Sequence, residues 1–98
     1  LFIKNGEEIS FISYLEDLSD KFSIKQKINI ARADKTKNQD IDKIDLQIDA
    51  QGDFVNLLSY LSAVEHSDYL ISISEVNLSR DSSFLINMSL KAKVYVKN

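Results

Sequence analysis

The chain has 98 residues, of which 44% are hydrophobic and 28% are charged, the profile of one globular domain spanning residues 1–98. It contains no cysteine, so disulfides and thiolate metal sites are excluded. The formal net charge of −3 argues against a general nucleic-acid binder, because phosphate binding depends on a basic surface. No run of residues approaches the roughly 18 apolar residues of a membrane span.

The first predicted element is a helix that starts at Glu7 and ends at Lys21. Acidic residues in its first turn interact favourably with the helix dipole. Ile9 lies outside the apolar face of this helix, which consists of Phe11, Tyr14, Leu15, Leu18 and Phe22. Before the helix, Leu1 to Ile3 is an apolar stub. Because there is no initiator Met, we expect this stub to be a strand end or the remnant of an upstream helix in a longer protein.

Two strands and a second helix are predicted next. Residues Ile24 to Ala33 alternate well enough for a strand, and a polar loop follows from Asp34 to Asp42. Strict apolar alternation from Ile44 to Ala50 predicts a strand with one buried face. Gly52 and Asp53 end that strand and start a helix. We expect the apolar stripe of this helix to lie on the sheet; it consists of Phe54, Leu57, Leu58, Leu61 and Val64.

The last two elements are strands joined by a hairpin. Apolar residues occupy odd positions from Tyr69 to Ile73 and even positions at Val76 and Leu78, so the inward face changes phase near Ser74, as in a β-bulge. A polar turn covers Arg80 to Ser83. The final strand alternates regularly and has the inward residues Ile86, Met88, Leu90, Ala92, Val94 and Val96.

The order helix, strand, strand therefore occurs twice. This order predicts an α+β fold of the ferredoxin-like type, circularly permuted as αββαββ, with a four-stranded antiparallel sheet and both helices on one face. Numbered along the chain, the strands would take the order 1-2-4-3. The strands that begin near Ile44 and Leu85 would be central, and the bulged strand would lie at an edge.

The sequence gives little support to catalysis or metal binding. His66 is the only histidine, and its position at a helix exit favours a capping role. Carboxylates such as Asp45 and Asp49 lack the glycine turn and terminal glutamate of a calcium loop, so we expect a solvated surface. The glycines, Gly6 and Gly52, form no phosphate loop. We therefore expect no enzyme activity, no metal and no cofactor.

Two other binding functions stay open at this stage. A local basic concentration is compatible with RNA, although the predicted open face offers only Tyr95 for stacking, and lysines also protect an edge strand. This concentration consists of Lys21, Lys25, Lys27, Arg32, Lys35 and Lys37. A small regulatory ligand-binding module of the same fold is the second alternative.

The repeated plan resembles the periplasmic domain of PilO-type pilus-assembly proteins and their relatives, the PilN-type proteins and the M component of type II secretion. The resemblance is carried by GDFVNLLSYLSAVEHSDYLISISEVNLSR and INMSLKAKVYV, and the first half, FISYLEDLSDKFSI through IDLQIDAQG, also fits. It is a pattern of apolar positions that covers nearly the whole chain.

The resemblance implies a non-enzymatic interaction domain in an inner-membrane assembly platform for type IV pili. Proteins of this type have one membrane helix and a coiled-coil stalk before a periplasmic domain, and they form homodimers or heterodimers with a PilN-type protein. A type II secretion platform is the alternative within the same fold. Edge strands and apolar residues outside the core would form the partner interface, and the candidates are Ile9, Val55, Leu70 and Leu85.

Overall fold

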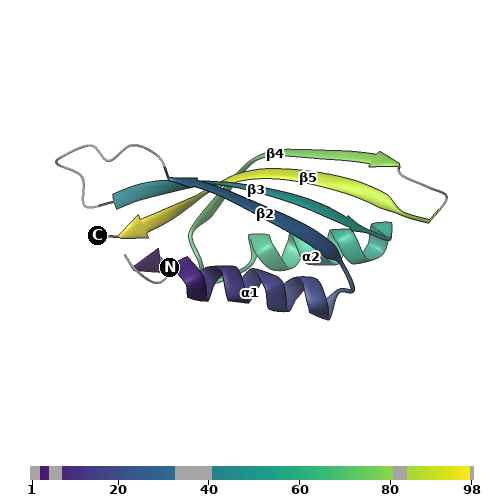
Figure 1. Ribbon diagram of the computed structural model, residues 1–98, viewed down its shortest axis with the longest axis horizontal. Helices are drawn as coiled ribbons and strands as arrows, with labels where there is room; N and C mark the ends of the chain where they lie inside the picture. The colour runs from purple at the N-terminus through teal and green to yellow at the C-terminus, as the bar shows by residue number, and fades with distance from the viewer. Residues whose placement is uncertain (1–2, 5–7, 33–40, 81–83, 98) are drawn as a thin grey trace.

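A computed structural model of the chain describes residues 3–4, 8–32, 41–80 and 84–97. Its two helices lie side by side on one face of a curved sheet (Figure 1). The elements are β1 (Ile3–Lys4), α1 (Glu8–Lys21), β2 (Lys25–Arg32), β3 (Ile41–Gly52), α2 (Phe54–Glu65), β4 (Ile71–Arg80) and β5 (Ile86–Lys97). Glu7 and most of the loop predicted at Asp34 to Asp42 lie outside the described residues, as does most of the turn at Arg80 to Ser83.

The four long strands pair antiparallel in the order β2-β3-β5-β4, which confirms the predicted ferredoxin-like arrangement. The two long strands β3 and β5 are central, and the bulged strand β4 is at an edge. The short strand β1 pairs in parallel with the last residues of β5, where Ile3 faces Val96. Of the predicted stub, Ile3 thus belongs to a strand, and Leu1 and Phe2 lie outside the described residues. Strand β3 begins at Ile41, three residues before the predicted Ile44.

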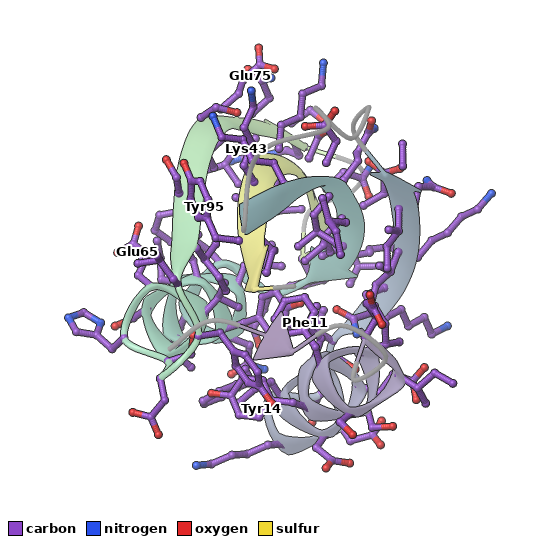
Figure 2. The ribbon with its side chains drawn as sticks, turned by 90° about the vertical axis from the view of Figure 1, so that its left-hand side faces the viewer. Phe11, Tyr14, Lys43, Glu65, Glu75 and Tyr95 are labelled. Carbon is purple, nitrogen blue, oxygen red and sulfur yellow. The ribbon has the colours of Figure 1, made fainter. Side chains whose placement is uncertain are left out.

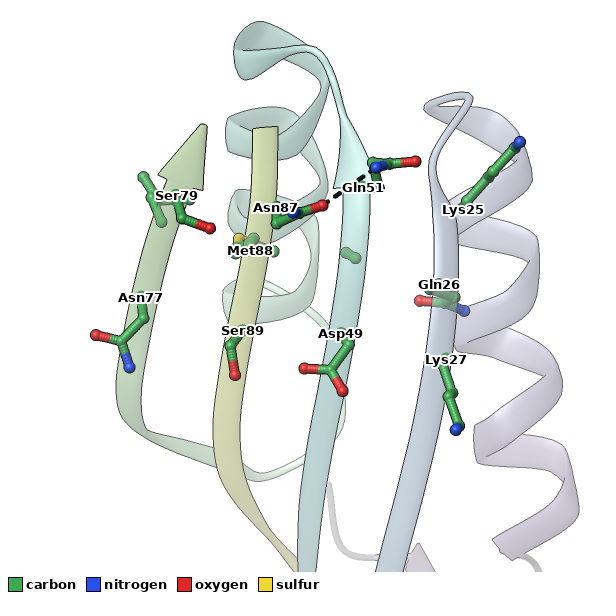
Figure 3. Close-up of a pocket in the computed structure, with 12 residues that line it drawn as sticks. Lys25, Gln26, Lys27, Asp49, Gln51, Asn77, Ser79, Asn87, Met88 and Ser89 are labelled. Atoms are coloured by element: carbon green, nitrogen blue, oxygen red, sulfur yellow. Dashed lines mark hydrogen bonds between the residues drawn. The ribbon is translucent and has the colours of Figure 1, made fainter. Parts of the chain in front are cut away.

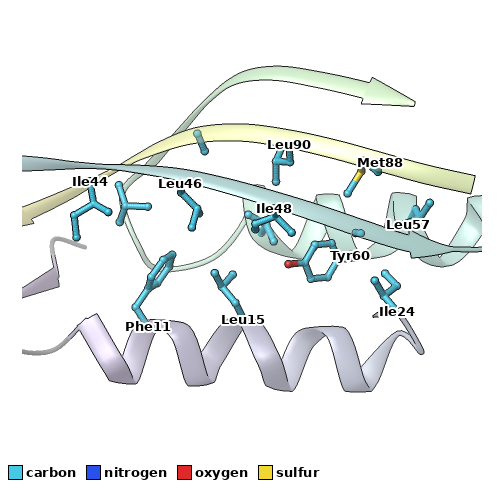
Figure 4. Packing of buried hydrophobic residues seen from close by; sticks show 14 residues of the cluster. Phe11, Leu15, Ile24, Ile44, Leu46, Ile48, Leu57, Tyr60, Met88 and Leu90 are labelled. Carbon is cyan, nitrogen blue, oxygen red and sulfur yellow. The ribbon is translucent and has the colours of Figure 1, made fainter. Parts of the chain in front are cut away.

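The core lies between the sheet and the helices, and most of it comes from the two central strands (Figure 4). Phe11 and Leu15 of α1 are buried, as predicted, and Ile9 is 81% exposed. The core residues supplied by the two central strands are Ile44, Leu46, Ile48, Ala50, Met88, Leu90, Ala92 and Val94. Burial of alternate residues on these strands leaves the other sheet face open to solvent.

The prediction for the second helix was partly wrong. Leu57 and Val64 are buried as expected, but Phe54 and Leu58 are 47% and 46% exposed, and the fully buried Tyr60 was not in the predicted stripe. A hydrogen bond explains why Tyr60 is buried: its hydroxyl donates a 2.5 Å hydrogen bond to Oε1 of Gln26 on β2. With its polar tip satisfied, the Tyr60 ring enters the core, and α2 is turned so that Phe54 and Leu58 lie toward solvent.

The bulge in β4 is confirmed. Ile73 faces Ala92 while Glu75 faces Lys91, so Ser74 is an extra residue with no counterpart on β5. The Ser74 hydroxyl donates a 3.1 Å hydrogen bond to the carbonyl of Lys91, which ties the bulge to the neighbouring strand. Bulges bend and twist a strand locally. The far half of β4 accordingly departs from the helix layer (Figure 1).

Local signals in the sequence account for two helix ends. Asp53 has an extended backbone and accepts a 2.8 Å hydrogen bond from the amide of Asn56, so it caps α2 as predicted. Helix α1 ends in a Schellman motif, because the amide of Ile24 donates to the carbonyl of Ser19 and that of Ser23 donates to the carbonyl of Asp20. Ser23 occupies the left-handed position of this motif with a φ of 56°.

Candidate interaction surfaces

The four apolar residues predicted to contact a partner are all exposed to solvent. Ile9 is 81% exposed, Val55 69%, Leu70 43% and Leu85 39%. Ile9 lies in the first turn of α1 and Val55 in the first turn of α2, whereas Leu70 and Leu85 immediately precede β4 and β5. Their role at an interface stays a prediction.

The structure places these four residues as two pairs. Leu85 adjoins Ile86, which faces Gly52, so Leu85 and Val55 both lie near the start of β5. The carbonyl of Leu70 accepts a hydrogen bond from the amide of Tyr95, near the other end of β5. Ile9 belongs to this end too, because α1 starts beside β1, which pairs with the last residues of β5 (Figure 1). Nine residues of strand separate these ends by about 30 Å. The two pairs therefore lie at opposite ends of β5.

The ring of Tyr69 anchors the segment that carries Leu70. It lies 4.9 Å from the ring of Phe11, edge to face, and 5.3 Å from the ring of Tyr14. Figure 2 shows Phe11 and Tyr14 projecting from α1 beneath the sheet. Because this aromatic cluster fixes the connection from α2 to β4, Leu70 is presented on an ordered piece of backbone.

The open face of the sheet is polar along its whole described length. At the end near the start of β5 it forms a shallow hollow of about 610 Å³ (Figure 3). Gln51 and Asn87, which face each other on β3 and β5, share a 3.2 Å hydrogen bond at this hollow, and Lys25, Lys27 and Asp49 also line it. Mixed amides, hydroxyls and opposite charges are typical of a solvated sheet face.

Further along the same face, one ion pair bridges β4 and β5. Lys91 Nζ lies 3.4 Å from the carboxylate of Glu75, with both side chains about half exposed (Glu75 is labelled in Figure 2). Hydrogen bonds from Asn77 and Lys91, together with the positive charge of Lys91, hold the pKa of Glu75 below its usual value. An exposed pair of this kind contributes little to stability.

Aromatic residues are sparse on this face. Among the described strand residues that point toward it, the aromatic one is Tyr95, whose ring lies 5.7 Å from the Lys43 ammonium (Figure 2). Stacking of RNA bases on a ferredoxin-like sheet depends on several such rings. Of the basic concentration, Arg32 ends β2, and the members whose exposure is described, Lys21, Lys25 and Lys27, are exposed at the end of α1 and the start of β2.

His66 caps the end of α2, as predicted. Its amide donates to the carbonyl of Ser62 over 2.9 Å, and its ring Nδ1 lies 2.8 Å from the same oxygen. Within the described part of the chain, no group of three or more His, Asp or Glu side chains is placed to hold a metal ion. In that same part, no helix combines the length and apolar character needed to cross a lipid bilayer.

The sequence missed one apolar surface, which lies between α2 and the far half of β4. Phe54 and Leu58 were expected to pack on the sheet, and Val76 and Leu78 were expected to face inward. Val76 and Leu78 do face the helix layer, because they pair with the buried residues Leu90 and Met88, but they are 38% and 48% exposed. We call Phe54, Leu58, Val76 and Leu78 the α2–β4 shoulder. An unbroken row of uncharged residues at the start of α2 was the available signal.

A second, smaller apolar surface lies at the opposite edge of the sheet. Ile12 and Glu16 of α1 and Ile28 and Ile30 of β2 line a hollow of about 310 Å³, and Ile30 is 44% exposed. Both edges of the sheet thus expose apolar side chains on the helix side. Edge strands also offer backbone donors and acceptors for pairing.

Comparison with known proteins gives matches in structure but not in sequence. No protein-family model matches the chain, and no curated protein matches its sequence. The type 4 fimbrial biogenesis protein PilO from Pseudomonas aeruginosa superposes with a TM-score of 0.72 at 16% identity, covering 89% of this chain and 67% of that one. The core region of PilO from the type IV pilus system of the same organism gives 0.61 at 20% identity, covering 86% and 91%.

A protein from Akkermansia muciniphila superposes with a TM-score of 0.78 at 16% identity, over 93% of this chain. The chain spans about half of that protein, 51% of its length. At identities this low, the similarity concerns the fold. The predicted resemblance to PilO-type proteins is confirmed at that level: this chain has the fold of the PilO core.

Proposed function

We propose that the chain is a non-enzymatic docking domain of the inner-membrane platform that assembles type IV pili. The observation that carries this proposal is the superposition on the PilO core, which extends over almost the whole chain. The described surface supports it, because its distinctive features are exposed apolar side chains at both sheet edges, and contiguous apolar surface is characteristic of protein contacts.

The proposed partners are a second copy of the chain and a PilN-type protein of similar fold. Residues 1–98 would form one periplasmic domain, held at the membrane by a segment of a longer protein. Ile9, Val55, Leu70 and Leu85 would contribute to these contacts. Since they lie in two pairs at opposite ends of β5, one pair can serve each partner.

Binding to a PilN-type periplasmic domain tests this function. The two domains are co-expressed, one carrying an affinity tag, and the complex is analysed by pull-down and sedimentation velocity. We expect co-purification and a stoichiometric complex. The proposal is refuted if no complex forms at protein concentrations of about 100 μM or more, because this concentration is on the order of the Kd of the weakest specific complexes.

Four single substitutions localise the contact: Ile9→Asp, Val55→Asp, Leu70→Asp and Leu85→Asp. A charge buried without a partner is costly, so a substitution inside the interface should weaken binding at least tenfold. Ser13→Asp on the exposed surface of α1 is the control and should bind as the unmodified chain does. Thermal unfolding of each variant separates lost binding from lost folding.

A further inference from the structure

The two helices occupy equivalent places in the repeated plan, but their solvent-facing surfaces differ. Helix α1 exposes charged residues, among them Glu16, Asp17 and Asp20. Helix α2 carries no charged residue from Phe54 to Val64, and in that span it exposes Phe54 (47%), Val55 (69%) and Leu58 (46%). A surface helix normally turns charged and polar residues toward water. Because its outer surface lacks charge, α2 is better suited than α1 to contact another protein.

The direction of this uncharged surface follows from the Tyr60 hydrogen bond. Tyr60 points toward β2, where its hydroxyl meets Gln26. Leu58 is two residues away and so lies about 200° around the helix axis, on the flank toward β4. Phe54 is one turn before Leu58 on that same flank. The apolar flank of α2 thus faces the side on which the bulged strand stands.

Strand β4 adds a second wall to this surface. Val76 and Leu78 point to the helix side of the sheet, yet no described helix lies beneath them, and they stay 38% and 48% exposed. With Phe54 and Leu58 they make an apolar patch on the order of 300 Å², the size at which a monomer's largest patch is often functional. The two described helices therefore leave the β4 edge of the sheet uncovered.

We infer that the missing helix is α2 of a second copy, packed antiparallel on α2 across a two-fold axis near Leu58 and lying beneath Val76 and Leu78. This inference rests on the proposed function and assigns its self-association to one surface. The four helices of the dimer then form one continuous layer in the order α1, α2, α2, α1 under the two sheets.

Side-chain sizes along α2 fit this arrangement. Phe54, Leu58 and Ser62 follow each other at intervals of four and form one ridge. In an antiparallel pair centred on Leu58, the large ring of Phe54 lies against the small Ser62 of the other copy, and Leu58 meets Leu58. A parallel pair would place ring against ring. The ridge is therefore self-complementary in the antiparallel sense required by a two-fold axis.

The charges of α2 permit pairing with a second copy. Two copies of a charged helix bring like charges together across a two-fold axis, and α2 carries no charge from Phe54 to Val64. Asp53 and Glu65 of opposite copies approach each other toward the ends of the pair, where a crossing angle of about 50° separates the two helices. A stable dimer buries about 800 Å² on each partner, so the shoulder is the apolar centre of an interface with a polar rim.

The test is a charge exchange at the two-fold axis, read by sedimentation equilibrium of the whole 98-residue chain. Leu58→Glu places two carboxylates together and should weaken self-association at least tenfold. Ile30→Glu is the matched control: Ile30 is 44% exposed at the opposite sheet edge and its substitution should leave the dimer intact. Mixing Leu58→Glu with Leu58→Lys should restore association as a heterodimer, which a folding defect cannot mimic.

A monomeric unmodified chain, a dimer that survives Leu58→Glu, or a dimer lost equally in Ile30→Glu would overturn this assignment. So would a failure of the Glu and Lys variants to associate with each other while both remain folded by circular dichroism. Binding of a PilN-type domain in any of these cases leaves the proposed function standing, which separates the two failures. Because the chain has no cysteine, Leu58→Cys provides a second readout: mild oxidation should yield a disulfide-linked dimer.

Discussion

Tyr60 of α2 and Gln26 of β2 are joined by a hydrogen bond from the phenol to Oε1, while the Nε2 of Gln26 donates to the carbonyl of Leu15 on α1 over 3.1 Å. One side-chain amide on a strand therefore links both helices. Tyr60 is fully buried, so its hydroxyl has no access to bulk water as a substitute partner. This network fixes the rotation of α2 and with it the surface that α2 presents.

Removal of the phenol should destabilise the chain. Tyr60→Phe keeps the ring but leaves Oε1 of Gln26 without its donor, and we expect a loss of about 1–3 kcal/mol in the free energy of unfolding. Urea denaturation followed by circular dichroism measures this loss. Tyr95→Phe, on the open face, is the control and should change stability by less than about 0.5 kcal/mol. Equal losses in both variants would contradict the role given to the network.

The same residue makes stability depend on pH in the alkaline range. Burial disfavours the phenolate and raises the pKa of Tyr60 far above its ordinary value of 10.0. A raised folded-state pKa contributes stability that is fully present below about pH 10 and is lost as the pH rises toward the folded value. Urea midpoints from pH 8 to 11.5 should fall more steeply in the unmodified chain than in Tyr60→Phe. Parallel slopes would show that Tyr60 is not the titrating group.

A methyl group at Gly52 should disturb the junction of β3 and α2. Gly52 is buried, and a Cβ placed there would lie 3.3 Å from Cγ1 of Ile24 and 3.8 Å from Cγ of Leu57. We expect Gly52→Ala to cost about 1–2 kcal/mol through this crowding. In an Ile24→Ala background the crowding atom is gone, so the added cost of Gly52→Ala should shrink. Additive costs in a double-mutant cycle would exclude the steric explanation.

The end of α1 offers a stabilising substitution. Ser23 holds a φ of 56°, a conformation in which a Cβ is unfavourable and glycine is preferred. Ser23→Gly should raise the free energy of unfolding by about 0.5–1 kcal/mol, since the strain at this position exceeds the entropy that glycine adds to the unfolded chain. Thermal melting measures the gain. Ser13→Gly in the middle of α1 is the control and should instead lower stability by about 0.5 kcal/mol.

The core and the shoulder should respond differently to truncation. Leu15 and Leu90 are fully buried, and Leu→Ala at either position should cost about 2–5 kcal/mol. Leu58→Ala at the half-exposed shoulder should cost about 1 kcal/mol or less in the monomer. Denaturation at low protein concentration, where self-association is negligible, makes the comparison. A cost at Leu58 similar to that at Leu15 would mean that Leu58 belongs to the core.

The periodicity of apolar residues was sufficient to predict the element order, the sheet and the bulge. Alternation from Ile44 to Ala50 follows directly from one buried and one wet face, and the phase change near Ser74 can be read by counting. The rotation of α2 could not be predicted this way. Apolar counting places Phe54 and Leu58 on the buried stripe, whereas the partner of Tyr60 is Gln26, 34 positions away in the chain. Long-range polar pairs leave no local periodic signal.

The exposure of Val76 and Leu78 was unpredictable for a related reason. Their phase was read correctly as inward, but burial requires something beneath them, and that depends on how far β4 bends from the helix layer. The four interface candidates Ile9, Val55, Leu70 and Leu85 were found as residues left over from the predicted core. A residue left out of the predicted core is expected to be exposed. That expectation does not tell which exposed residues lie on the same surface.

Ser74 is the one extra residue in an otherwise continuous ladder, since Ile73 and Glu75 already face the consecutive residues Ala92 and Lys91. Deleting it would leave every other pair of β4 and β5 in place and keep each side chain on its present face. Straightening the strand would bring its distal half down toward α2 and close the shoulder. We therefore expect deletion of this one residue to close this edge of the sheet to another helix.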